Sequence, residues 1–161
     1  MNDQEDSSRK FKESLDVFRR RTKAKKCVPG PDTWLVYCDA SFKCGRAGIA
    51  VQIIKGKSSE MIEIRVNARG AQHAELKAIR LGLQELSKRA GSHVTALVQN
   101  DSEWAIETCL GANEPQRDYI KAEIGKIRDV EIHFKEVLYK KCTGREIRRA
   151  DKASKRTRKR T

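Results

Sequence analysis

Four acidic residues of this chain have types and surroundings that could support metal chemistry. They are Asp39 in Tyr37-Cys-Asp-Ala-Ser41, Glu75 in Ala74-Glu-Leu76, Asp101 in Asn100-Asp-Ser-Glu-Trp104, and Asp151 in Ala150-Asp-Lys-Ala153. Carboxylates brought together near a sheet edge repel one another and require a divalent cation. Oxygen ligands without His or Cys favour Mg²⁺ or Mn²⁺ over zinc. If the four acids meet, they predict a metal site suited to phosphodiester chemistry.

Each acid taken singly also has a structural explanation. Asp101 and Ser102 could cap the helix that follows them, and Asp39 could anchor a turn with Ser41. Glu75 could form an ion pair with Arg80 or Lys77, and Asp151 could offset its basic neighbours. These explanations compete with the metal site until the positions of the side chains are known.

The elements that must position the acids follow from the apolar pattern. Strands are expected where apolar residues run together or alternate, and helices where their period lengthens. The expected strands are residues 34–40, 47–54, 60–66, 95–99 and 130–138, and the expected helices are 71–89, 102–110, 116–128 and a last one from about 145. Short loops between the first strands and helical crossovers between the later ones predict an α/β fold. Its five-stranded mixed sheet combines a three-strand antiparallel meander with parallel strands, and helices cover both faces.

This framework places three of the acids. Asp39 falls near the end of an apolar strand, where an ionised carboxylate is costly without a compensating cation. Glu75 shares a helix face with Ile79 and Gly82, toward the apolar side. Asp101 follows a strand at its carboxyl end, where open α/β sheets bind ligands.

Composition limits the class of protein. A chain of 161 residues with 38% hydrophobic content suits one domain of ordinary size. The sequence has neither a run of apolar residues long enough to span a membrane nor the apolar region of a secretory signal at its start, so we expect a soluble intracellular protein of cytoplasm or nucleus. Five cysteines without a C-x-x-C pair predict reduced thiols, with a Cys38–Cys44 bridge left open.

The net charge of +13 is unevenly distributed. Residues 1–33 carry +3, residues 34–139 carry +1 and residues 140–161 carry +9. Basic ends on a nearly neutral body predict a nucleic-acid partner; a solubilising or nuclear-targeting tail is the alternative. The residues expected to contact nucleic acid are Arg19, Arg20, Arg21, Arg148, Arg149, Lys155 and Arg156.

Three regions are expected along the chain. Residues 1–33 form a basic extension and linker, in which Phe11, Leu15 and Phe18 mark one face of a helix that could dock on the body, on a protein partner or on a second copy in a homodimer. Residues 34–154 form the folded domain that carries the four acids. Residues 155–161 form a basic tail.

The four motifs, in this order, resemble those of ribonuclease H of type 1 and more broadly the ribonuclease H-like superfamily. The separations between the acids, 36, 26 and 50 residues, also fit. The resemblance implies that Asp39 bridges two Mg²⁺ or Mn²⁺ ions, with Glu75 and Asp101 completing one site and Asp151 the other. It further implies that Ala40, Ser41, Glu75 and Ser102 contact the substrate, and that the enzyme cuts the RNA strand of RNA/DNA hybrids, leaving 5′-phosphate and 3′-hydroxyl ends.

Several positions differ from the family pattern. Gly70-Ala71 stands where Asn or Thr-Asn is common, residues 110–113 lack an aromatic, residues 139–150 lack His, and a basic protrusion between the middle helices is absent. These differences affect positions expected to bind the substrate and leave the four acids unchanged. Two alternatives therefore stay open: a related nuclease acting on double-stranded RNA or DNA, and a non-catalytic nucleic-acid-binding protein that retains a relict site.

Overall fold

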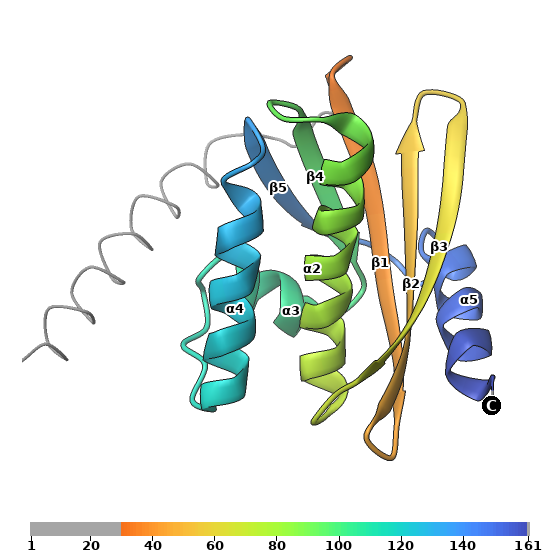
Figure 1. Cartoon of the computed structure of the whole chain (residues 1–161), viewed down its shortest axis with the longest axis vertical. Helices are drawn as coiled ribbons and strands as arrows, with labels where there is room; N and C mark the ends of the chain where they lie inside the picture. The colour runs from red at the N-terminus through yellow and green to blue at the C-terminus, as the bar shows by residue number, and fades with distance from the viewer. Residues whose placement is uncertain (1–29, 161) are drawn as a thin grey trace, which may run out of the picture.

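The computed structural model describes residues 30–160, which fold into one mixed sheet with helices on both faces (Figure 1). The strands are β1 (Thr33–Lys43), β2 (Arg46–Lys55), β3 (Ser58–Asn67), β4 (Thr95–Asn100) and β5 (Glu136–Lys141). The helices are α2 (Ala71–Ala90), α3 (Glu103–Cys109), α4 (Asp118–Glu131) and α5 (Arg148–Lys159).

The sheet has the strand order β3-β2-β1-β4-β5. β1, β2 and β3 pair antiparallel, and β4 and β5 add in parallel beside β1. The turn from β1 to β2 uses Cys44 and Gly45, both with positive φ, a conformation that glycine adopts without steric cost. The predicted α/β class, with its meander and parallel strands, is confirmed.

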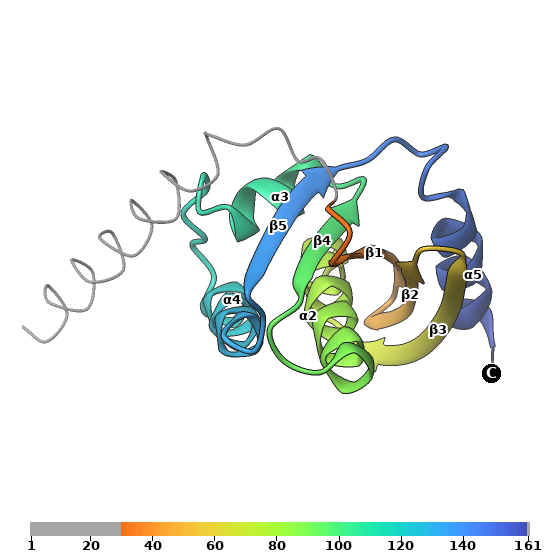
Figure 2. The same ribbon diagram turned by 90° about the horizontal axis from the view of Figure 1, so that it is seen from above.

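Two apolar layers cover opposite faces of the sheet (Figure 2). The larger layer packs α2, α3 and α4 on residues such as Val36, Val51 and Val98. The smaller layer packs α5, through Ala150 and Ala153, on Ala50 of β2. Because side chains alternate along a strand, Val36 and Cys38 of β1 face α2, whereas Tyr37 and Asp39 face α5.

Two glycines allow the helices to approach the sheet closely. A Cβ at Gly48 of β2 would lie 2.2 Å from the carbonyl oxygen of Ser154 in α5. A Cβ at Gly82 of α2 would lie 2.5 Å from Sγ of Cys38. Neither site has room for a larger residue, so both glycines set the distance between layers.

The prediction was wrong in the segment between α4 and β5. A strand over 130–138 was expected, but Val130 ends the buried stripe of α4 and β5 begins only at Glu136. The helical stripe of Ile120, Ile124, Ile127 and Val130 continues through the first residues of the expected strand, and burial of this stripe against the core decides the outcome.

Other expectations concern the chain ends and cysteines. Residues 155–159, expected in a basic tail, lie in α5, whereas Arg19, Arg20, Arg21 and the helix proposed for partner or dimer contacts fall outside the described residues. Cys38, Cys44, Cys109 and Cys142 are free thiols, so a Cys38–Cys44 bridge is not formed. Within residues 30–160, no helix combines the length and apolar character needed to cross a membrane.

Candidate metal centre

The site forms where β1 and β4 stop pairing. Their last paired residues are Tyr37 and Gln99. Asp39 and Asp101 each lie two residues farther along, so the parallel register carries both acids to the same level. Asp39 is buried at 4% exposure, whereas Asp101 is exposed between β4 and α3.

The helix α2 brings a third carboxylate to this point. Glu75 lies in its second turn, and ligand oxygens of Asp39, Glu75 and Asp101 all lie within 4.8 Å of one another. The three residues come from β1, α2 and the end of β4, far apart in sequence. The structure thus brings together three of the four predicted acids in one cluster.

No basic side chain among residues 30–160 forms an ion pair with Glu75. Arg80 instead binds the buried carboxylate of Glu123, and Lys77 donates to the carbonyl oxygen of Asn67 at 2.9 Å. The cation partners that a purely structural role for Glu75 would need are therefore occupied elsewhere.

Neutral donors hold the Glu75 carboxylate in place. Nδ2 of Asn100 donates to Oε2 of Glu75 at 2.8 Å, and the backbone of Ala40 also hydrogen-bonds to it. Burial nevertheless raises the pKa of Glu75 to about 8, and the nearby charges of Asp39 and Asp101 contribute, against the opposing effect of these hydrogen bonds.

Asp39 is held from the opposite side of the sheet. The buried hydroxyl of Ser154 in α5 donates to Oδ2 of Asp39. Burial raises the pKa of Asp39 to about 6; Asp101 and Asp151 add to the rise, whereas the hydrogen bond from Ser154 and the charge of Lys155 oppose it. Both raised values have the same cause, which is negative charge gathered in a poorly solvated place.

Asp151 stands beside this cluster and is not one of its three members. It lies in the first turn of α5, and its Oδ2 accepts a hydrogen bond from Nζ of Lys155 at 2.8 Å. Its charge reaches Asp39, as the effect on the pKa of Asp39 indicates. Asp151 thus offsets a basic neighbour, as its structural explanation expects, and also borders the carboxylate cluster.

The residues predicted to contact substrate line the same region. Ala40 and Ser41 follow Asp39 in β1, and Ser102 caps α3 by accepting from the backbone N–H of Ala105 at 3.2 Å. The predicted basic residues of the last helix all lie exposed on α5: Arg148, Arg149, Lys155 and Arg156.

Sequence reasoning missed two residues that position the carboxylates. Asn100 is fully buried and also donates to the carbonyl oxygen of Cys38 at 2.7 Å while accepting from the backbone N–H of Ser102 at 2.7 Å. Ser154 is likewise fully buried. A polar residue at the end of a buried strand and a serine among the small residues of a helix were the available signals, but neither indicates its partner.

The donor set fits a hard divalent cation. The cluster offers only carboxylate oxygens as ligands. Amide and hydroxyl groups donate hydrogen bonds to these carboxylates, and no basic side chain among residues 30–160 forms an ion pair with Glu75. Oxygen ligands of this kind suit Mg²⁺ or Mn²⁺. A divalent ion between them would compensate the negative charge that burial and the neighbouring acids make unfavourable at Asp39 and Glu75.

Comparison with known proteins identifies the fold. No protein-family model matches the chain, and no curated protein matches its sequence. One similar solved structure is the N-terminal RNase H domain of Rv2228c from Mycobacterium tuberculosis, as a fusion protein with maltose-binding protein. It gives a TM-score of 0.71 at 14% sequence identity, and the match covers 78% of this chain and 98% of that one.

Two ribonucleases H1 are similarly related. The enzyme of the halophilic archaeon Halobacterium salinarum gives a TM-score of 0.67 at 15% identity, over 78% of this chain and 96% of that one. LC11-RNase H1, in complex with an RNA/DNA hybrid, gives 0.69 at 18% identity, over 76% and 94%. With its sheet order, helix placement and these neighbours, the chain has the ribonuclease H-like fold.

Proposed function

We propose that this protein is a metal-dependent endoribonuclease that hydrolyses the RNA strand of RNA/DNA hybrids and leaves 5′-phosphate and 3′-hydroxyl ends. The observation that carries the proposal is the cluster of Asp39, Glu75 and Asp101, formed without a basic partner for Glu75 in a ribonuclease H-like fold. The complex of LC11-RNase H1 with an RNA/DNA hybrid supports the choice of substrate.

In this proposal the carboxylates hold two ions of Mg²⁺ or Mn²⁺. Asp39, Glu75 and Asp101 would hold one ion, and Asp39 and Asp151 would hold the other. When bound, such ions favour ionisation of an attacking water and stabilise negative charge on the leaving oxygen. Lys155 contacts only Oδ2 of Asp151, so the other carboxylate oxygen, Oδ1, would be the ligand atom.

The chain's own residues supply the orientation. Asn100 fixes the Glu75 carboxylate, and Ser154 fixes one oxygen of Asp39, so both acids are held before any ligand arrives. Ala40, Ser41, Glu75 and Ser102 border this point and are the groups proposed to contact the ribose and its phosphate. A 2′-hydroxyl recognised there would distinguish RNA from DNA.

One observation favours a second candidate, a related nuclease that acts on double-stranded RNA or DNA. Gly70 precedes α2 with no side-chain capping hydrogen bond, at the position where the hybrid-specific enzymes commonly carry Asn. A side chain that could contact the hybrid is therefore missing at the start of α2. The substrate assay must include all three duplexes.

The test measures cleavage of labelled hybrid, double-stranded RNA and DNA with Mg²⁺ or Mn²⁺. We expect the wild-type protein to cut the hybrid, and Asp39→Asn and Asp101→Asn to lose at least about a hundredfold in rate, because each removes charge from the cluster. Asp129→Asn, an exposed acid on α4, serves as the matched control and should retain full activity.

Three results discriminate the candidates. Cleavage of another duplex in preference to the hybrid supports the second candidate. Binding without metal-dependent cleavage of any duplex would mean that the site is a relict. Cleavage that survives both substitutions would place the active site elsewhere.

A further inference from the structure

The helix α5 has two chemically opposite sides. The side toward the sheet carries small buried residues: Ala150, Ala153, Ser154 and Thr157. The exposed cations of the helix and of its C-cap, which together we call the basic face of α5, are Arg148, Arg149, Lys152, Lys155, Arg156, Lys159 and Arg160. The small residues let the helix lie close on β2, and the cations lie on the flank and the solvent side of the helix.

These cations exceed the acids that contact them. Lys155 pairs with Asp151, while Arg156 and Arg160 share the single carboxylate of Glu63. Within residues 30–160, Arg149, Lys152 and Lys159 have no ion pair. The basic face therefore keeps a surplus of positive charge that nothing in the described fold balances.

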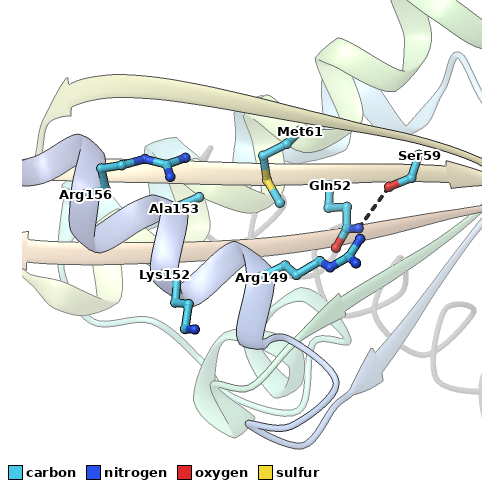
Figure 3. Close-up of a pocket in the computed structure, with 7 residues that line it drawn as sticks. All are labelled: Gln52, Ser59, Met61, Arg149, Lys152, Ala153 and Arg156. Carbon is cyan, nitrogen blue, oxygen red and sulfur yellow. Dashed lines mark hydrogen bonds between the residues drawn. The ribbon is translucent and has the colours of Figure 1, made fainter.

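A hollow runs along this face. Between α5 and the strands β2 and β3 lies a cavity of about 400 Å³, with Arg149, Lys152 and Arg156 projecting from the helix and Gln52 and Met61 from the strands (Figure 3). A second hollow of about 430 Å³ is lined entirely by basic-face residues from Lys152 to Arg160. The basic face thus has two depressions lined by basic side chains.

The basic face is continuous with the carboxylate cluster. Ser154 binds Asp39, and Lys155 binds Asp151, so the middle of α5 lies beside the candidate metal centre and basic residues flank it on both sides. From Arg149 to Arg160 the cations extend over about 16 Å, since a helix rises about 1.5 Å per residue. That distance is too great for one phosphate group and is long enough to contact several phosphates of a nucleic-acid strand.

We infer that the basic face of α5 binds the phosphate backbone of the nucleic acid whose scissile phosphate lies at the carboxylate cluster. The inference rests on the proposed function for the identity of that substrate. It makes α5 a binding surface beside the cluster, which contacts several phosphates of the strand that passes through the site.

The surroundings favour a nucleic acid over other polyanions. The only large hydrophobic side chain exposed among residues 30–160 is Ile132, just after α4, and Met61 beside the basic face is half-buried, so this face has no exposed apolar residue to enter a membrane. An acidic peptide would match the charge, but peptide binding does not explain why this face adjoins a cluster of carboxylates. Binding of a phosphodiester strand does explain it, because cleavage of such a strand is the chemistry that the cluster supports.

The test uses the full chain and Lys152→Glu/Lys159→Glu, which reverses two exposed lysines that have no ion pair. The matched control is Lys121→Glu/Lys126→Glu on α4, which changes the net charge equally on the opposite side of the sheet. Binding of a fluorescent hybrid is followed by anisotropy in EDTA over a range of salt concentrations. The α5 variant should bind at least about tenfold more weakly, with its log–log salt slope reduced by about two, whereas the control changes affinity less than about threefold.

Substrate length provides a second readout. Hybrids of about 20 base pairs should bind the wild-type protein more than tenfold better than hybrids of about 8, and the α5 variant should lose most of this preference. Equal losses in both variants, an unchanged slope in the α5 variant, or displacement of the hybrid by polyglutamate of equal charge at equal concentration would each overturn the inference.

The outcomes separate this inference from the proposed function. Loss of binding in the α5 variant of a protein that cuts no duplex would leave the basic face established and the nuclease proposal wrong. Cleavage of a duplex by the wild-type protein, together with normal binding by the α5 variant, would support the nuclease proposal and overturn the inference about the basic face.

Discussion

Asp39 and Glu75 are held in an environment that favours their protonated forms. Their pKa values are raised to about 6 and about 8, mainly by burial. A raised pKa means that the folded protein binds the proton more tightly than the unfolded chain does. Linkage then requires the free energy of unfolding to fall as pH rises through the range between the unfolded and folded pKa values.

This linkage predicts a pH-dependent stability for the metal-free protein. In EDTA, the free energy of unfolding should fall by about 5 kcal/mol between pH 5 and pH 8.5, because both carboxylates must ionise without a cation. Denaturant unfolding at a series of pH values measures the change. Glu75→Gln, which is neutral at every pH, should flatten the dependence and be more stable than wild type at pH 8.5; identical curves for the two proteins would contradict the argument.

Ser154 should control the affinity of the cluster for metal. Its hydroxyl lowers the pKa of Asp39, so Ser154→Ala should raise that pKa further and leave less carboxylate ionised at neutral pH. We expect about a tenfold loss in Mn²⁺ affinity at pH 7, measured by electron paramagnetic resonance, and a smaller loss at pH 9. Ser92→Ala, in an exposed loop, is the control. A loss that is independent of pH would show that Ser154 acts only through packing.

Among the elements, α5 contributes to the site from the opposite face of the sheet. It supplies Asp151 and Ser154, and it is held against β2 by the close approach at Gly48. Its own sequence is almost entirely basic and small residues, so its place depends on packing more than on an apolar stripe of its own.

Gly48→Ala should therefore displace α5. The added methyl would clash with the backbone of Ser154 and Arg158, and overpacking of this kind costs about 1–3 kcal/mol. Metal affinity should fall together with stability, since Ser154 moves away from Asp39. Gly125→Ala, at an exposed position of α4 with nothing near its Cβ, should instead stabilise by about 0.5–1 kcal/mol. Thermal unfolding and Mn²⁺ titration of both variants test this, and normal metal binding by Gly48→Ala would refute the dependence.

At the scale of the whole molecule, metal binding and folding are thermodynamically coupled. The cluster joins β1, α2 and the end of β4, so an ion held there stabilises contacts between distant parts of the chain. A ligand present at a hundred times its dissociation constant adds about 2.7 kcal/mol to stability.

We accordingly expect Mg²⁺ or Mn²⁺ to raise the melting temperature of the wild-type protein at pH 8 by roughly 5–10 °C. The Asp39→Asn variant should show little of this shift, because it lacks the central ligand, and Asp129→Asn should show all of it. Equal shifts in all three proteins would indicate that the ions bind outside the cluster.

Much of the fold could be predicted from the sequence because its signals are local. Strand alternation and helical periodicity act over a few residues, which is why β1 to β4 and α2 were expected close to their observed bounds. The segment near Val130 was predicted wrongly because its apolar residues satisfy both patterns, and only burial of the α4 stripe in the core decides between them.

The sequence by itself determined which acids are present, in what order, and on which kinds of element they lie. Only the tertiary structure decided their partners. Arg80 binds Glu123, 43 residues away, which leaves Glu75 without a cation, and Ser154 reaches Asp39 across 115 residues. Asp151 lies beside the cluster, held by Lys155. Such pairings depend on how the layers pack on the sheet, a property of distant segments together that no local pattern carries.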